Sequence, residues 1–291
     1  MIRSICFQNI LLADDGSDHA RAAIQLLLKL TLSPETHITV LRVFSSQQAA
    51  EAFPLEAAVK ETCTLLQEKG FNAEPELLLG HPAEKIIEYA EQHHPDLIVL
   101  GAKGLRATLG ILLGGVAQQI IEYASCPVLV VRAPLKRLRR ILLVADGSPN
   151  SLHAAECLAR FPFPEQADLR VMHVLPPHYQ AAIPEMPYAI AVEQPSAVSE
   201  ELAHQSANEE EDGHRLLARM AEILSGSQLK VKTVLEQGDA ATEIIEYVKL
   251  NRIDLIVAGS RGLSRMRSWL LGSVSRKLVH YSGCSVLIVR S

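Results

Sequence analysis

Residues 97–104 read LIVLGAKG, and residues 255–262 read LIVAGSRG. Each stretch is followed, after the same nine-residue spacer, by a second small-residue pair, Gly114-Gly115 in the first copy and Gly272-Ser273 in the second. Both copies end with similar apolar segments, CPVLVVR at 126–132 and CSVLIVR at 284–290. The chain is therefore an internal duplication, and its architecture is one unit used twice.

The beginnings of the two copies also match, and they set the predicted domains. NILLADDGS at 9–17 corresponds to RILLVADGS at 140–148. We predict one domain over residues 1–133 and a second over residues 139–291. Each is long enough to bury a core of its own.

The second copy carries an insertion that the first copy lacks. The difference in residue number between matched positions of the two copies is larger from Gly238 onward than it is before Val174. The extra residues therefore lie between these two positions, and we place them at about 175–213. The insertion opens with LPPHYQAAIPEMP, whose prolines exclude a central strand or helix. From about Ser199 the apolar residues recur at helical spacing. A lid over the second copy's site and a passive loop are both open interpretations of 175–198.

Short aliphatic runs alternate with amphipathic segments within each copy. In the first copy we predict strands over Ile10–Ala13, His37–Phe44, Glu76–Leu79, Leu97–Leu100 and Val128–Val131. We predict helices from a Ser17 cap through Leu30 and over Phe53–Lys69, Ala83–Gln92 and Gly115–Tyr123. Continuous aliphatic strands joined by helices indicate a parallel sheet covered on both faces. The handedness of the crossovers then gives a doubly wound, open α/β unit.

The composition narrows the classes of function. A net charge of −5 gives no electrostatic case for nucleic acid or an anionic membrane as partner. The five cysteines are scattered without a CxxC pair, which favours free thiols in a reducing compartment. We find no signal peptide and no stretch long enough to span a bilayer, so we expect a cytoplasmic protein.

Polar residues and glycines follow two strands of each copy. Asp15 and Asp146 come after the first strand, and the pairs Gly101-x-x-Gly104 and Gly259-x-x-Gly262 come after the fourth. Ligands of open α/β sheets bind beyond the carboxyl ends of the strands, where the strand order reverses. If the first and fourth strands are neighbours, these loops face one crevice.

The residue types at this crevice suit a phosphorylated ligand. Glycines permit positive φ and let backbone N–H groups approach an anion closely. Gly272-Ser273 stands where a helix begins, and a helix N-terminus offers free N–H groups and a favourable dipole to phosphate. The Asp146 carboxylate would repel phosphate, so we place it at the far end of the ligand, near a sugar or base.

At these residues the chain resembles a known family. Gly259-x2-Gly262-x9-Gly272-Ser273 is similar to the motif of the ATP-binding universal stress proteins, and the duplication resembles their tandem members. The resemblance implies ATP, with its phosphates on Gly262, Gly272, Ser273 and Ser275, its ribose near Asp146, and its adenine near the backbone of Val174. The second-copy candidates are Asp146, Gly147, Val174, Gly259, Arg261, Gly262, Gly272, Ser273, Val274 and Ser275.

The same resemblance implies the strand order 3-2-1-4-5 in each copy. It also implies association through final strands, here between Val128–Val131 and Val286–Val289, with a homodimer as a further possibility. We expect Mg²⁺ or Mn²⁺ to arrive only with the phosphates, because no carboxylate cluster forms a dedicated cage.

The first copy departs from the motif. Its candidates are Asp15, Val43, Gly101, Gly104, Gly114 and Gly115. Gly115 stands where the motif has Ser or Thr, and Ala117 stands opposite Ser275. A lost hydrogen bond to a charged group is worth about 1.5–3 kcal/mol, or one to two decades of affinity. We therefore predict two sites of unequal affinity, with the second tighter.

Other interpretations stay open at this point. The two aspartates could be helix caps, and either glycine pair alone could belong to a plain turn. We predict a regulatory protein rather than an enzyme, with no catalytic residues and slow ATP hydrolysis not excluded. The rivals are an adenylyl-handling enzyme of the wider α/β group and a nucleotide-free interaction module.

Overall fold

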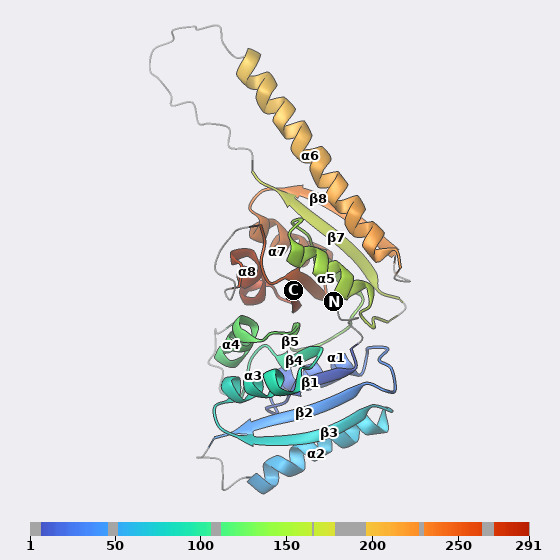
Figure 1. The fold of residues 1–291 in the computed structure, drawn as a ribbon, viewed down its shortest axis with the longest axis vertical. Helices are drawn as coiled ribbons and strands as arrows, with labels where there is room; N and C mark the ends of the chain where they lie inside the picture. The colour runs from blue at the N-terminus through green and yellow to red at the C-terminus, as the bar shows by residue number, and fades with distance from the viewer. Residues whose placement is uncertain are drawn as a thin grey trace.

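The computed structural model describes residues 7–45, 52–105, 112–164, 166–177, 196–226, 230–263 and 271–290. The first copy contains β1 (Asn9–Ala13), α1 (Asp18–Leu27), β2 (His37–Phe44), α2 (Ala52–Glu68), β3 (Asn72–Leu79), α3 (Pro82–His93), β4 (Leu97–Gly101), α4 (Gly115–Tyr123) and β5 (Val128–Val131). The second contains β6 (Arg140–Val144), α5 (Pro149–Ala159), β7 (Asp168–Leu175), α6 (Ser196–Leu224), β8 (Lys230–Gln237), α7 (Ala240–Asn251), β9 (Leu255–Gly259), α8 (Ser273–Tyr281) and β10 (Ser285–Val289). Figure 1 shows the two copies one above the other.

The strands of the described residues join one ten-stranded sheet in the order β3-β2-β1-β4-β5-β10-β9-β6-β7-β8. Neighbouring strands within a copy are parallel, and each half has the expected order 3-2-1-4-5. The copies meet where β5 and β10 pair antiparallel, with Leu129 opposite Leu287. The predicted α/β fold with mostly parallel strands is confirmed, and the final strands pair where the resemblance placed them.

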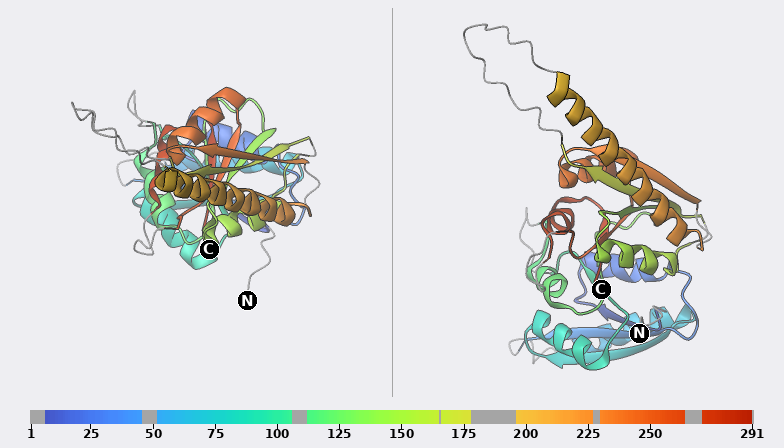
Figure 2. Two further views of the ribbon diagram at one scale, coloured as in Figure 1. Left: turned by 90° about the horizontal axis from the view of Figure 1, so that it is seen from above. Right: turned by 45° about the horizontal axis from the view of Figure 1, so that its top comes forward.

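The hydrophobic core is organised by sheet face and not by copy. One cluster of buried residues lies under α1, α2, α5 and α6, and it contains both Leu129 and Leu287. The other lies under α3, α4, α7 and α8, and it contains both Val130 and Val286. The two views of Figure 2 show the helices covering both faces of the continuous sheet. Each core therefore runs through the junction between the copies.

Most of the predicted elements of the first copy agree with the structure to within one residue at each end. Strand β3 is an exception, since it begins at Asn72, four residues before the predicted Glu76, and includes Pro75. Because β3 is an edge strand, the missing N–H of Pro75 can face away from the ladder. Helix α1 starts at the predicted Ser17 cap but ends at Leu27, short of Leu30.

The predicted helix of the insertion is α6, and it lies over β7 and β8. Among the residues of α6 whose burial is described, Leu217, Met220 and Leu224 in its C-terminal part anchor it in the core. Its N-terminal half extends beyond the sheet in Figure 1. The lid and loop interpretations concern residues 175–198, of which 178–195 lie outside the described residues. Among the described helices, none has the length and apolar content needed to cross a bilayer.

Candidate functional site

Each copy holds a pocket at the carboxyl ends of its strands. The first pocket has a volume of about 270 Å³ and the second about 240 Å³. All the candidates of the first copy line its pocket: Asp15, Val43, Gly101, Gly104, Gly114 and Gly115. The second is lined by Asp146, Val174, Gly259, Arg261, Gly262, Gly272, Ser273, Val274 and Ser275. Gly147 is the one candidate outside the lining; its φ of 79° shapes the turn after β6.

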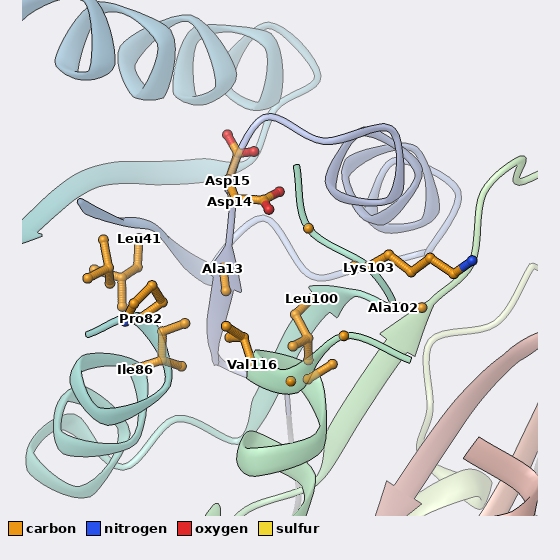
Figure 3. Close-up of a pocket in the computed structure, with 16 residues that line it drawn as sticks. Ala13, Asp14, Asp15, Leu41, Pro82, Ile86, Leu100, Ala102, Lys103 and Val116 are labelled. Atoms are coloured by element: carbon orange, nitrogen blue, oxygen red, sulfur yellow. The ribbon is translucent and has the colours of Figure 1, made fainter. Parts of the chain in front are cut away.

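The aspartates sit in tight turns after β1 and β6. Asp15 Oδ1 accepts a hydrogen bond from the Ser17 N–H at 3.0 Å, and Asp146 Oδ1 accepts one from the Ser148 N–H at 3.0 Å. The helix caps are the serines, which accept from N–H groups in the first turns of α1 and α5. The interpretation of the aspartates as the caps is therefore wrong, and Figure 3 shows Asp15 at the end of β1, beside the first pocket.

The motif glycines lie where neighbouring groups approach the backbone closely. A Cβ on Gly101 would lie 2.7 Å from His19 Cβ, and one on Gly259 would lie 2.8 Å from Asn150 Cβ, so strands β4 and β9 approach α1 and α5 closely. A Cβ on Gly104 or Gly262 would collide with Oδ2 of the aspartate in the same copy. Neither pair adopts positive φ, so the conformational argument for these glycines was wrong.

The helices that follow the glycine loops begin without a side-chain cap. Helix α4 starts after Gly114 and α8 after Gly272, and neither N-cap makes a side-chain hydrogen bond to the helix. Helices α1, α5 and α7 are capped by Ser or Asp. The first N–H groups of α4 and α8 therefore face the pockets with the positive end of the helix dipole.

The two serines of the second motif have different environments. Ser273 is exposed at the pocket, whereas Ser275 is buried and its hydroxyl donates to the Gly259 carbonyl at 2.7 Å. The single proton of the Ser275 hydroxyl is used in this bond, so a contact of Ser275 with phosphate would be made by its backbone N–H, and the assignment of a phosphate to Ser275 stays a prediction. The hydroxyl bond ties the start of α8 to the end of β9. Ala117 has no hydroxyl to do the same for α4.

Sequence reasoning missed a buried ion pair beside the first pocket. Asp14 lines this pocket while only 4% exposed, and it accepts hydrogen bonds from Gly16 N at 2.8 Å, Thr62 Oγ1 at 3.0 Å and Arg42 Nη2 at 3.1 Å. The second copy has Ala145 and His173 at the matching positions, and His173 Nδ1 lies 2.8 Å from the Ala145 carbonyl oxygen. The available signal was the difference between DDGS and ADGS in the aligned turns.

The described lining of each pocket contains a cationic side chain but no cluster of metal ligands. Lys103 lines the first pocket and Arg261 the second. Within the described residues, no group of three or more His, Cys, Asp or Glu could hold a metal ion. Burial raises the pKa values of Cys126, Cys157 and Cys284 to about 12, so these thiols are protonated near neutral pH. The arrangement suits binding of an anion by backbone N–H groups.

Comparison with known proteins gives consistent matches to one family. The model of the Universal stress protein family matches residues 7–132 and 137–290. The universal stress protein YxiE of Bacillus subtilis is 30% identical over 151 residues, which are 52% of this chain and 98% of that protein. A universal stress protein of Methanocaldococcus jannaschii is 31% identical over 161 residues, covering 55% of this chain and 87% of that one. The crystal structure of a universal stress protein from Archaeoglobus fulgidus shares the fold, with a TM-score of 0.64, 20% identity and 98% of both chains covered.

Proposed function

This chain belongs to the universal stress protein family, and from that premise we propose that it is a regulatory protein that binds an adenine nucleotide, ATP, in its second copy. The observation that carries the proposal is the uncapped N-terminus of α8, which opens into a glycine-lined pocket. The first copy offers the same backbone and would bind the same ligand more weakly.

The phosphate end of the ligand fits the start of α8. The Gly272 N–H donates to the Ser260 carbonyl at 2.8 Å, which leaves the next N–H groups, from Ser273 to Ser275, for the phosphates. The Ser273 hydroxyl and the guanidinium of Arg261 can add charge-assisted hydrogen bonds. A divalent cation would be bound by the phosphates themselves, since the described pocket supplies no cluster of ligands for it.

The nucleoside end fits the cavity. Asp146 Oδ1 accepts a hydrogen bond from the Ser148 N–H within the turn. The carboxylate can accept further hydrogen bonds, which suits it to ribose hydroxyls. Val174, Val144 and Ile244 give apolar surface for a base. A cavity of about 240 Å³ is smaller than the usual range for ligand pockets, about 300 Å³ and above, so the nucleoside fills it and the phosphates lie at its mouth.

The proposal is for binding that biases conformation or partner choice, without a catalytic residue. The four buried or half-buried free cysteines of the described residues suit a reducing compartment, and we place the protein in the cytoplasm on that ground. The rival hypothesis is slow ATP hydrolysis by the same site, and a phosphate-release assay separates it from binding alone. Release that scales with protein and is lost in Asp146→Ala would favour the rival.

The test is nucleotide binding by Asp146→Ala and by its matched control, Asp15→Ala. Mass spectrometry of the ligand released from native protein is expected to detect an adenine nucleotide. After its removal, calorimetric titration is expected to resolve a tight and a weak site. Asp146→Ala should weaken the tight site by about one to two decades, because a charged hydrogen-bond acceptor is lost. Asp15→Ala should leave the tight site in place.

An empty native protein that takes up no ATP in titration would overturn the proposal. It would favour the nucleotide-free interaction module instead. Loss of the tight site in Asp15→Ala, with Asp146→Ala unchanged, would contradict the assignment of the tighter site to the second copy.

A further inference from the structure

Two arginines cross the junction between the copies. Arg132 follows β5, and its Nη2 donates to the carbonyls of Val279 at 2.7 Å and His280 at 3.3 Å, in the last turn of α8. Arg290 follows β10 in the same way, and its Nη2 donates to the carbonyls of Ile121 and Glu122, in the last turn of α4. Each copy thus caps the C-terminus of the other copy's pocket helix.

The capped helices are those whose N-termini face the two pockets. The last carbonyls of a helix have no partner within it, and a cation there is favourable to the helix dipole. Arg132 and Arg290 therefore hold the ends of α8 and α4 that lie opposite the proposed phosphate positions. An ion pair between Arg276 of α8 and Glu122 of α4, at 3.8 Å, adds a second connection between these helices.

The Arg132 guanidinium also contacts the segment that leads into the first pocket. Its Nη1 donates to the Leu112 carbonyl at 2.7 Å, two residues before the N-cap Gly114 of α4. One guanidinium thus joins the loop that leads to the first pocket with the last turn of the helix that begins at the second. The residue equivalent to Leu112 in the second copy lies outside the described residues.

We propose that Arg132 couples the two pockets, so that a nucleotide in the second pocket strengthens binding in the first. This inference rests on the proposed function. A phosphate on the N-terminus of α8 orders that helix and with it the carbonyls that Arg132 contacts. The guanidinium then holds the Leu112 carbonyl in place, so the described residues Leu112 and Leu113, which lead into Gly114, lose less freedom when the first pocket binds its own ligand. Coupling of this kind is reciprocal between the sites.

The test compares Arg132→Gln with Arg132→Lys and with the control Arg137→Gln. Arg137 is a linker arginine that pairs with Asp254 at 3.4 Å and contributes to neither pocket lining. ATP affinity of the first pocket is measured by calorimetry with the second pocket intact and with it weakened by Asp146→Ala combined with Ser273→Gly, so that the second pocket stays empty while the first fills. We expect disabling the second pocket to weaken the first by about fivefold or more in otherwise native protein. In Arg132→Gln, the ratio of the first-pocket affinities measured with and without a functional second pocket should be near one.

Arg132→Lys keeps the charge but cannot donate from two nitrogens in a fixed fork, so its ratio should fall between those of native protein and Arg132→Gln. Arg137→Gln should retain the native ratio. Equal first-pocket affinities with and without the second pocket, in native protein that binds two nucleotides, would overturn the coupling and leave the proposed function standing.

Hydrogen exchange of the ligand-free protein provides a readout that needs no nucleotide. Arg132→Gln should speed exchange of the backbone amides in residues 112–118 and 276–282, while Arg137→Gln leaves them unchanged. Unchanged exchange in both segments of Arg132→Gln would show that the guanidinium does not hold them, and it would overturn the inference. Native protein that binds no nucleotide would overturn the proposed function and this inference together.

Discussion

Gly115 and Ser273 occupy the same position at the starts of α4 and α8, and only one of them has a hydroxyl. Apart from the chain next to it, an added Cβ at Gly115 would meet no atom of the described residues within 4 Å, so these residues leave space for a serine. We predict that Gly115→Ser strengthens ATP binding to the first pocket by about tenfold, since it adds a hydrogen bond to a charged group. Calorimetric titration of the nucleotide-free protein measures this change.

The control for this residue is the reverse change in the other copy. Ser273→Gly should weaken the second pocket by a similar factor, because it removes the same hydroxyl. Ala117→Ser should act more weakly than Gly115→Ser, since the equivalent Ser275 hydroxyl donates to the Gly259 carbonyl and not to the ligand. Equal effects of Ala117→Ser and Gly115→Ser would contradict this assignment of roles.

At this scale the sequence located the pocket residues but not all of their roles. Recurrence at fixed spacing was enough to bring Asp146, Gly262 and Gly272 to one cavity. The Asp14 carboxylate meets partners 28 and 48 residues away, in Arg42 and Thr62, and no local pattern relates such positions. Long-range hydrogen bonds of this kind depend on how the elements pack, so they appear only in the folded structure.

Helix α6 packs against the sheet through its C-terminal part. Met220 is fully buried under the face of the sheet that α6 covers, whereas its neighbour Arg219 is exposed. We predict that Met220→Ala lowers the free energy of unfolding by about 2–5 kcal/mol, through lost burial and the cavity left behind. Arg219→Ala should change it by less than about 0.5 kcal/mol. Chemical denaturation measures both, and equal effects would contradict the packing of α6 through this face.

Elements were predictable where periodicity and turn chemistry agreed. The Ser17 cap, β2, α4 and β5 follow from local signals that the fold does not override. Strand β3 was predicted too short because Pro75 interrupts the local strand pattern, although the implied order 3-2-1-4-5 places β3 at an edge, where a proline is tolerated. Topology therefore supplied what local propensity lacked.

Within the described parts of the molecule, the two copies share their hydrophobic cores. Both hydrophobic clusters contain residues from each copy, and the sheet continues through the pairing of β5 with β10. An unfolded copy would expose the edge strand and both core faces of the other. We therefore expect the two copies to unfold in one cooperative transition, in which the calorimetric and van't Hoff enthalpies agree.

Leu129 provides the test, because it is fully buried at the junction and lies opposite Leu287. Leu129→Ala should lower the free energy of unfolding by about 2–5 kcal/mol and leave a single transition at a lower temperature. Leu66→Ala, a buried α2 change away from the junction, should also move the whole transition. If Leu66→Ala instead divided the heat absorption into two steps and moved only one, the copies would be independent domains. The shared cores would then not couple them, because cooperativity requires that neither copy remain folded without the other.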